Sequence, residues 1–433
     1  MSLEIVAAVG GENIMRIVSR GMAIAVAALS LTGNAVAAPV ETVLHSFTGN
    51  TNGPDGTLPS GGLVIDAQGN LYGTTQQGGN SRNAGTVFKL SKDGAETILY
   101  SFCQKTNCVD GDDPHTKLII DNQGALYGTT SAGGDSDVGT IFKLTPPTNG
   151  NSLWTYTVLH SFSGLPFGTG NDGAFPTSLI AGDSGAFYGT TSGGGSGTNS
   201  NGTVFKLTPP SNSQDTWKVT ILYNFCPQTP CSGGARPSSL VVDNGTFYGT
   251  TNVGGNGYGT VFKLTPDDKT GWTEIVLYSF NGGSDGAPPL SLSIDNKDNI
   301  YGSTSGGGNG GNGTIFKLTP AGIESVYSFC AQPSCSDGSQ PVGNLSFSKS
   351  GTIYGTTGNG GTDNNGTVFS LIAPINAKAN WTEAVLYRFS GIDGANPSAG
   401  LIFNEGAFYG TTGNGGTANN GTVFKLTVID PWR

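Results

Sequence analysis

The chain has 433 residues, 71 of them glycine, a formal net charge of −10, and only 12% charged residues. Because each glycine inside a helix costs about 1 kcal/mol relative to alanine, this composition argues against a helical protein and favours a fold with many tight turns. The chain also lacks the excess of basic residues that is typical of proteins that bind nucleic acid or anionic lipid.

The N-terminal segment differs from everything that follows it. Arg16 and Arg20 precede an apolar run over residues 21–31, and the sequence Ala-Val-Ala-Ala, which contains an Ala-x-Ala pattern, ends at residue 38. This order of a basic region, a short apolar region and small residues is typical of a secretory signal peptide, and the run is too short to span a membrane. We therefore expect a signal peptide over residues 1–38, with translation starting at Met15. No transmembrane segment is predicted after it, so the expected location is the periplasm, the cell surface or the medium.

Four short β-prone sequences then recur in a fixed order, seven times, with a period of about 56 residues. We name them a to d. Strand a is a short apolar stretch after a proline, and strand b is Tyr-Gly-Thr/Ser-Thr. Strand c is Gly-Thr-Val/Ile-Phe-Lys/Ser-Leu, and strand d is an apolar run ending in phenylalanine. Strand b begins at Tyr72, Tyr127, Tyr188, Tyr248, Tyr301, Tyr354 and Tyr409. Strand c begins at Gly85, Gly139, Gly202, Gly259, Gly313, Gly366 and Gly421.

Four antiparallel strands in each unit of this length match the blade of a propeller. The sequence therefore predicts an all-β fold, a single seven-bladed β-propeller over residues 40–427, followed by a tail over residues 428–433. The unit opens on a d strand at 43–47 and finishes on a c strand at 421–426. We expect the N-terminal strand to complete the last blade and close the ring, and we expect a monomer.

The repeated Tyr-Gly-Thr-Thr and Gly-Thr-Val-Phe-Lys-Leu sequences, with the glycine-rich spacer between them, resemble the GloVer repeat of exported bacterial "choice-of-anchor" proteins. The resemblance covers nearly all of residues 40–427. It implies export and tandem repeats, and often a C-terminal sorting anchor, which this sequence does not show. It implies no settled activity.

Six cysteines form three Phe-Cys-x4-Cys sequences directly after d strands. In an exported chain an even number of cysteines indicates disulfides, and pairs in alternate blades should lie far apart. Zinc binding would need four thiolates from separate blades, and a redox role would favour a Cys-x-x-Cys spacing. We therefore expect three local bridges, Cys103–Cys108, Cys226–Cys231 and Cys330–Cys335.

An Asp-Gly-x-x-Pro sequence enters strand a in six of the seven units. The aspartate is interpreted as the cap of an Asx-type turn, with a ring of cation-binding carboxylates as the alternative. In the remaining unit Arg236 replaces the acidic character, and it is a candidate ligand for an anion or an ordinary surface arginine. The aspartates are Asp55, Asp110, Asp172, Asp285, Asp337 and Asp393.

One of these loops gathers Asp110, Asp112, Asp113 and His115. Oxygen-rich clusters of this kind can hold Ca²⁺, although a solvated acidic loop is the alternative, and no firm metal site is predicted. The other two histidines, His45 and His160, stand in d strands at a position where the other units have tyrosine, and they are interpreted as packing variants.

Four tryptophans precede d strands in units with long c–d loops. They are expected to cover the hairpin and the outer edge of the blade, and the alternative is a platform for stacking sugar rings. They are Trp154, Trp217, Trp272 and Trp381.

No sequence motif of a known catalytic site is present, so no catalytic residue is predicted. Three functions remain open. The first is an extracytoplasmic binding or scaffold module for an unknown extracellular ligand, such as a carbohydrate or an envelope partner. The second is a hydrolase or lyase acting on an extracellular polysaccharide-like substrate, and the third is a passive structural protein of the cell surface. Because the repeated residues are explained by the blade, a specific activity is expected where the copies differ.

Overall fold

The computed structural model forms two compact units, residues 1–37 and residues 38–433. In the first unit, β1 (Ile5–Val9) pairs antiparallel with β2 (Asn13–Ile17). The apolar run of the expected signal peptide lies outside the described residues, so the signal peptide stays a prediction. The described residues are 5–9, 13–17, 38–49, 55–148, 153–164, 171–196, 201–212, 214–226, 230–268, 271–374 and 380–428.

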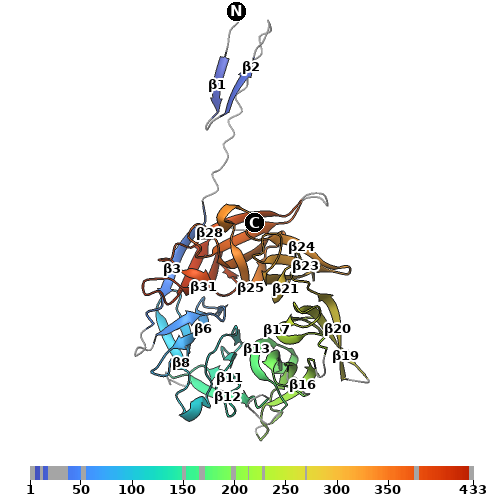
Figure 1. Cartoon of the computed structure of the whole chain (residues 1–433). Helices are drawn as coiled ribbons and strands as arrows, with labels where there is room; N and C mark the ends of the chain where they lie inside the picture. Colours follow the sequence, from blue (N-terminus) through green and yellow to red (C-terminus); the bar gives the residue numbers. More distant parts are fainter. Residues whose placement is uncertain are drawn as a thin grey trace, which may run out of the picture. The chain divides into compact units, whose positions relative to one another are not determined.

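The second unit is a seven-bladed β-propeller, as predicted (Figure 1). Each blade is an antiparallel sheet in which strands a, b, c and d lie side by side in that order. Strand a is innermost and strand d outermost. In the first and last blades strand a is split into two short strands, which accounts for their five-stranded sheets.

The strand bounds follow the repeat blade by blade. The a strands are β4 (Gly56–Pro59) with β5 (Val64–Ile65), β9 (Ile119–Ile120), β13 (Ala174–Ala181), β17 (Ala235–Asp243), β21 (Ala287–Ile294), β25 (Ser339–Phe347), and β29 (Ala395–Pro397) with β30 (Ile402–Asn404). The b strands are β6 (Leu71–Gly78), β10 (Leu126–Thr130), β14 (Phe187–Gly193), β18 (Thr246–Val253), β22 (Ile300–Gly306), β26 (Ile353–Asn359) and β31 (Ala407–Asn414).

The c strands are β7 (Thr86–Leu90), β11 (Thr140–Thr145), β15 (Thr203–Thr208), β19 (Thr260–Asp267), β23 (Thr314–Thr319), β27 (Thr367–Ile372) and β32 (Thr422–Thr427). The d strands are β8 (Glu96–Ser101), β12 (Thr155–Ser161), β16 (Lys218–Asn224), β20 (Gly271–Ser279), β24 (Gly322–Ser328), β28 (Thr382–Arg388) and β3 (Val40–Ser46). Three short 3-10 helices complete the described elements, η1 (Thr106–Cys108), η2 (Asp183–Gly185) and η3 (Pro333–Cys335).

The ring closes through the first and last strands of the unit. β3 pairs antiparallel with β32, with Val40 opposite Thr427 and Ser46 opposite Thr422. β3 thereby becomes the outer strand of the seventh blade, which confirms the predicted closure. The pairing gives β32 a partner strand on both sides, so the last blade does not end on an open c strand.

Neighbouring blades are joined by pairs of phenylalanine side chains. The phenylalanine that ends each d strand meets the phenylalanine of the next blade's c strand edge to face, with ring centroids 4.9–5.5 Å apart. Phe47 and Phe88 form this pair across the point where the ring closes. Edge-to-face geometry is favoured for aromatic pairs, and these residues are almost completely buried. The core of the propeller therefore lies in the seams between blades.

Candidate functional site: the central channel

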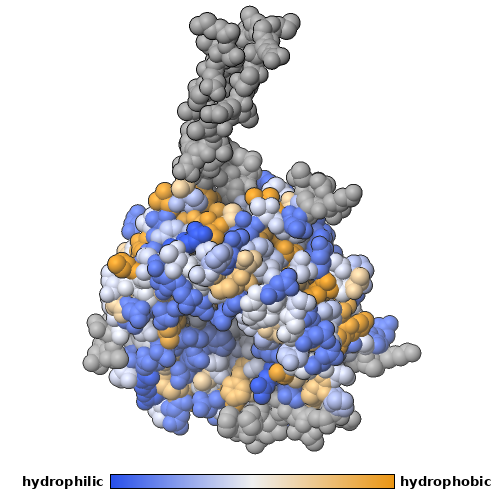
Figure 2. Space-filling model, turned by 45° about the horizontal axis from the view of Figure 1, so that its top comes forward, coloured by the Kyte–Doolittle hydropathy of each residue, from blue (hydrophilic) through white to orange (hydrophobic). Residues whose placement is uncertain are grey.

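The innermost strands enclose a cavity of about 780 Å³ at the centre of the ring. All seven blades contribute to its wall, mainly with small, hydroxyl-bearing and aliphatic side chains. Figure 2 shows one face of the molecule, where hydrophilic side chains surround smaller apolar areas. A cavity of this size is in the range that holds a drug-sized or oligomeric small ligand.

One position of the repeat lines the channel in every blade and differs between the copies. It is the residue before the leucine of strand a, and its members are Gly62, Lys117, Ser178, Ser239, Ser291, Asn344 and Gly400. Lys117 is the member that carries a charge. Its side chain is exposed to the channel, but the enclosing blades desolvate it and lower the pKa of its ammonium group. The channel-lining residues that the structure describes include His115 besides Lys117, but no carboxylate.

Hydroxyl pairs make most of the wall rigid. Thr116 shares a hydrogen bond of 2.8 Å with Thr129 in the second blade, and Ser291 shares one of 2.9 Å with Ser303 in the fifth. Ser291 also donates to the backbone carbonyl of Gly343 in the next blade, at 2.7 Å. Such bonds link strand a to strand b and one blade to the next, so the wall presents a preformed surface.

The first blade departs from this pattern beside Lys117. Gly61 stands where the second blade has Thr116, and the hydroxyl of Thr74 is therefore buried without a hydrogen-bond partner. The hydroxyl of Ser60, which lines the channel, is also buried without a partner. Lys117 lies next to Gly62 of the first blade, because a Cβ atom placed on Gly62 would be 3.7 Å from the Cγ atom of Lys117. The first two blades thus combine an ammonium group with unsatisfied hydroxyls.

The residue before the proline of strand a has a left-handed backbone in six blades, with φ between 54° and 58°. In the fifth blade the corresponding residue is Pro288, which follows a cis peptide bond. The side chain at this position differs from blade to blade, and only Asp113 and Arg236 are candidate site residues from the sequence. The six residues are Leu58, Asp113, Phe175, Arg236, Gln340 and Asn396.

The recurring aspartates cap backbone N–H groups of the d–a loops, as predicted, but these groups precede the aspartate in the chain, whereas an Asx turn uses the N–H two residues after it. Asp110 is fully buried and accepts hydrogen bonds from the backbone N–H groups of Gln104 and Lys105, at 2.9 and 3.1 Å, and from the hydroxyl of Tyr100 at 2.7 Å. Asp337 repeats the arrangement with Ala331, Gln332 and Tyr327. These carboxylates are occupied by their own loops.

The predicted acidic cation loop is not gathered into one ligand set. Asp110 is committed to its loop, the carboxylate of Asp113 accepts a hydrogen bond from Ser131 at 2.7 Å, and Asp112 lies in a β-bridge with Ala132. Within the part of the chain that the structure describes, these residues and His115 do not form a group of ligand atoms within 4.8 Å of one another. Calcium binding at this loop stays a prediction that the geometry does not support.

Arg236 is exposed, and its backbone N–H donates to the carbonyl of Asn201 at 2.8 Å. It does not line the channel with Lys117. Its role as an anion ligand therefore stays a prediction.

The four tryptophans pack against aromatic side chains of the b strands. Trp154 meets Tyr72 of the preceding blade edge to face at 6.2 Å, and Trp381 meets Tyr301 in the same way at 6.3 Å. Trp217 packs against both Tyr127 and Phe187, and Trp272 packs on Phe247. These contacts fit the expected covering role, and sugar stacking on these rings stays a prediction.

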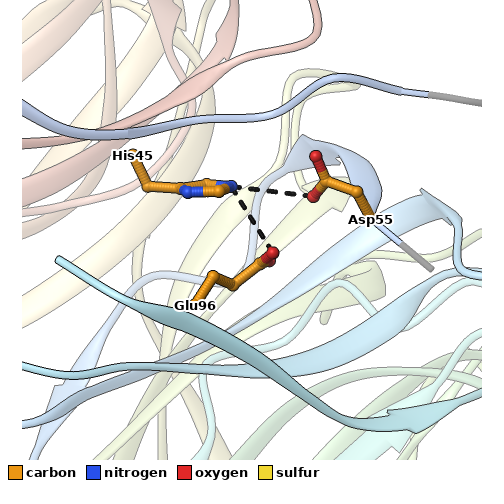
Figure 3. Close-up of side chains that lie close together, drawn as sticks. All are labelled: His45, Asp55 and Glu96. Carbon is orange, nitrogen blue, oxygen red and sulfur yellow. Dashed lines mark ion pairs between the residues drawn. The ribbon is translucent and has the colours of Figure 1, made fainter. Parts of the chain in front are cut away.

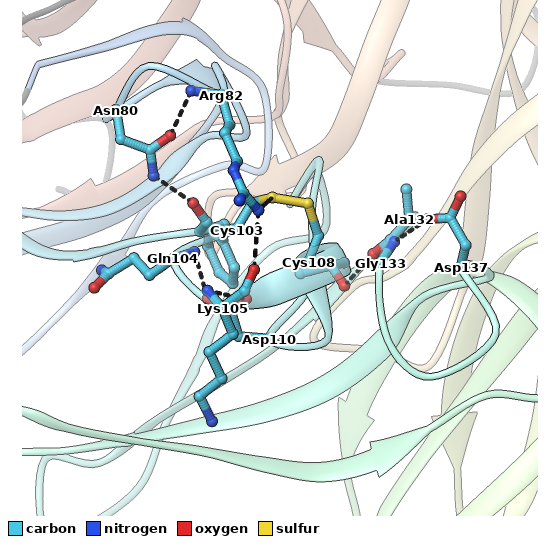
Figure 4. The surroundings of a disulfide bond; sticks show 12 residues. Asn80, Arg82, Cys103, Gln104, Lys105, Cys108, Asp110, Ala132, Gly133 and Asp137 are labelled. Atoms are coloured by element: carbon cyan, nitrogen blue, oxygen red, sulfur yellow. Dashed lines mark hydrogen bonds between the residues drawn. A yellow bond between two sulfur atoms is a disulfide. The ribbon is translucent and has the colours of Figure 1, made fainter.

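All three predicted disulfides are present. Around the first (Figure 4), the guanidinium of Arg82 donates to the Sγ atom of Cys103 and to the carbonyl of Lys105, at 3.3 and 3.0 Å. The backbone N–H of Gly134 donates to the carbonyl of Cys108 at 2.9 Å. The bridge closes the d–a loop on itself, and these hydrogen bonds hold the bridged loop against the neighbouring b–c loops, on the face to which the longer loops belong.

The family model of the Gloeobacter/Verrucomicrobia repeat matches residues 31–197 and 239–430. The chain belongs to this repeat family. No curated protein is similar enough in sequence to match it. Membership in the Gloeobacter/Verrucomicrobia repeat family accounts for the tandem units and agrees with the resemblance seen in the sequence.

Solved structures with the same fold share little sequence with this repeat protein. The extracellular domain of a hybrid two-component system from B. thetaiotaomicron is 13% identical, with a TM-score of 0.50 over 90% of this chain and 41% of that chain. A polysaccharide lyase is 10% identical, with a TM-score of 0.49 over 87% and 91% of the two chains. A PQQ-bound aldose sugar dehydrogenase from Streptomyces coelicolor is 14% identical, with a TM-score of 0.45 over 91% and 100%. Likeness at this level concerns the fold alone.

Proposed function

We propose that this protein is an exported binding module whose central channel takes an acidic, polyhydroxylated ligand of the oligosaccharide class. The single observation that carries the proposal is Lys117, a charged residue at a position that is small or neutral in the other six blades. A partly desolvated ammonium group favours a carboxylate partner, because a charge-assisted hydrogen bond is stronger where water is reduced.

The rest of the wall supports the same class of ligand. Ser60 lines the channel near Lys117 and its hydroxyl has no hydrogen-bond partner, and a buried hydroxyl of this kind is stabilised when a ligand supplies the missing hydrogen bond. Serine and threonine side chains from several other blades line the remaining wall, between aliphatic residues that can contact the apolar faces of sugar rings.

Export is part of this proposal. Three disulfides support it, because such bonds persist mainly in oxidising compartments. Among the described residues, no helix has the length and apolar character needed to cross a membrane.

The test is a calorimetric titration with a uronate-containing oligosaccharide and with a neutral oligosaccharide of the same length. We expect the acidic sugar to bind and Lys117→Met to weaken its binding about 10- to 100-fold, the range of a hydrogen bond to a charged group. Lys92→Met is the matched control, because Lys92 is an exposed lysine whose only described ion pair is with Glu405 on the surface. The Lys92→Met variant should bind the acidic sugar with the same affinity as the wild type.

Two results would contradict the proposal. One is that no acidic sugar of the panel binds, which favours a passive structural role. The other is that Lys117→Met binds the acidic sugar as tightly as the wild type. Release of shorter sugars during the titration, detected by mass spectrometry, would favour the alternative of a hydrolase or lyase.

A further inference from the structure

Three ligating side chains converge at the seam where the ring closes (Figure 3). His45 lies on β3, Asp55 precedes β4 in the first blade, and Glu96 begins β8, the outer strand of that blade. The Nε2 atom of His45 is 3.6 Å from Oδ1 of Asp55 and 3.6 Å from Oε2 of Glu96. The side chains are 13–19% exposed, so this group lies mostly beneath the surface but within reach of solvent.

Each residue of this cluster has one buried side-chain atom without a hydrogen-bond partner. Nε2 of His45, Oδ1 of Asp55 and Oε1 of Glu96 are all buried without a hydrogen bond. The second carboxylate oxygen of Asp55 is held by Thr48, whose backbone N–H and hydroxyl donate to it at 2.6 and 2.7 Å. Asp55 is therefore oriented by its loop, with its free oxygen directed toward His45. Buried polar atoms left unpaired in this way are unusual, and each calls for a ligand or a proton between them.

Another seam of the same ring also has a histidine at the position of His45, and its contacts differ. At the next-but-one seam, Nε2 of His160 bonds directly to Asp172 at 2.8 Å, and Val219 occupies the position that corresponds to Glu96. His160 is thus a packing variant, as the sequence analysis interpreted it. His45 is different, because it stands back from Asp55 and faces a second carboxylate.

Seams with a glutamate at this position have tyrosine in place of histidine. The hydroxyl of Tyr327 donates to Asp337 at 2.8 Å beside Glu383, and Tyr387 donates to Asp393 beside Glu41. In the described part of the chain, His45, Asp55 and Glu96 form the group of three that combines an imidazole and two carboxylates with all ligand atoms within 4.8 Å. The combination is therefore a departure from the repeat rather than a product of it.

The spacing fits a metal ion better than direct hydrogen bonds. A tetrahedral ion with bonds of about 2.0–2.2 Å to nitrogen and oxygen holds its ligand atoms about 3.4 Å apart, close to the separations here. A direct hydrogen bond would need a shorter contact, as His160 shows. One imidazole and two carboxylates suit Zn²⁺ and similar first-row ions, whereas Ca²⁺ and Mg²⁺ prefer oxygen ligands alone.

We propose that His45, Asp55 and Glu96 bind a zinc-class divalent cation that ties the N-terminal strand to the first blade. The ion joins β3, which belongs to the seventh blade, to two segments of the first blade. It therefore spans the closing seam and stabilises the closed ring, because it binds the folded chain and has no preformed site in the open one. Three protein ligands leave a fourth position for water.

The experiment titrates the chelator-treated full chain with Zn²⁺ and follows both heat of binding and thermal unfolding. We expect one equivalent to bind and to raise the unfolding temperature. His45→Tyr places at this position the residue that the first, third, fourth, fifth and sixth blades use, so it should fold and lose the site. Glu96→Gln, which keeps the size of the side chain, should weaken binding at least tenfold. His160→Tyr is the matched control and should bind one equivalent like the wild type.

Adventitious binding to this acidic chain is distinguished by the same variants, because His45→Tyr removes no negative charge. The proposal is overturned if the folded wild type binds no Zn²⁺. It is equally overturned if His45→Tyr and Glu96→Gln both bind one equivalent with unchanged affinity. Neither result would bear on the channel, since the binding of acidic sugars depends on Lys117.

Discussion

The glycine of each Tyr-Gly-Thr sequence leaves room for a phenylalanine of the adjacent c strand. In β26, Gly355 lies opposite Phe369, and a Cβ atom on Gly355 would be 2.6 Å from the ring of Phe369. In each blade the second threonine of strand b shares a buried hydrogen bond with the first threonine of strand c, as Thr357 does with Thr367 at 2.9 Å. Both repeated residues are therefore explained by packing inside the blade.

Gly355→Ala should lower the free energy of unfolding by about 1–3 kcal/mol, because the added methyl group overpacks a site next to a fully buried ring. Gly358→Ala is the control in the same strand, where a Cβ atom would make an ordinary contact of 3.6 Å. It should change the stability by no more than about 0.5 kcal/mol. Denaturant unfolding of both variants measures the difference, and equal effects would contradict this account of the glycine.

Sequence alone predicts the residues that repeat better than those that do not. The seven copies gave the blades, the three disulfides and the capping aspartates, because each pattern recurs and has a local physical cause. Lys117 carried no such signal. Its meaning depends on the innermost strand facing a common channel, although a comparison of the seven residues before the leucine would have singled it out. The sequence interprets His45 as a packing variant and gives no signal of its second carboxylate neighbour, because Glu96 meets it only after the ring has closed.

At the scale of the strands, several seams bury a glutamate of the outer strand against the preceding blade. Burial raises the pKa of Glu41, Glu274 and Glu383 to about 7, from the ordinary glutamate value of 4.5. The charges of Asp393 and Asp337 contribute at Glu41 and Glu383, whereas Glu274 has the hydroxyl of Tyr223 as its neighbour at 3.2 Å. In the unfolded chain these carboxyl groups have ordinary pKa values, so folding favours their protonated forms.

Stability should therefore fall as the pH rises from about 4.5 to above 7. The contribution of each glutamate is fully present below the unfolded pKa and is lost as the pH passes the raised pKa of the folded state. Glu274→Gln should match the wild type near pH 5 and exceed its unfolding temperature near pH 8, since glutamine never carries the buried charge. Thermal unfolding of both proteins across this pH range measures the difference in their unfolding temperatures.

Glu405→Gln is the control for this prediction, because Glu405 is exposed and has only a surface ion pair with Lys92. It should leave the pH profile of the unfolding temperature unchanged. A Glu274→Gln profile parallel to that of the wild type would show that the buried charge at this seam does not set the pH dependence.

At the scale of the whole molecule, the ring depends on one strand contributed from the other end of the unit. β3 supplies the outer edge of the seventh blade and also Phe47, which packs on Phe88 of the first blade. Its contacts with the last blade include the hydrogen bond of Ser46 to Thr417 at 3.0 Å. Removing this strand would expose the edge of β32 and leave half of a buried aromatic pair.

A chain of residues 49–433 should unfold at a lower temperature than a chain of residues 38–433, and it should associate through the free edge of β32. Differential scanning calorimetry and size-exclusion chromatography compare the two chains. A synthetic peptide of residues 38–49 should restore part of the lost stability by adding the missing strand. Equal unfolding temperatures and elution volumes would contradict this account of the closure.

The position of β3 also sets the order in which the propeller can be completed. β3 is the first strand of the unit to leave the ribosome, and its partner β32 is the last. The entropic cost of joining the two ends grows only slowly with the length between them, so the long interval is no obstacle once the whole chain exists. Until β32 has been synthesised, β3 has no partner strand in its own sheet. A chain interrupted anywhere before residue 422 would keep an open ring, however many of its blades had already formed.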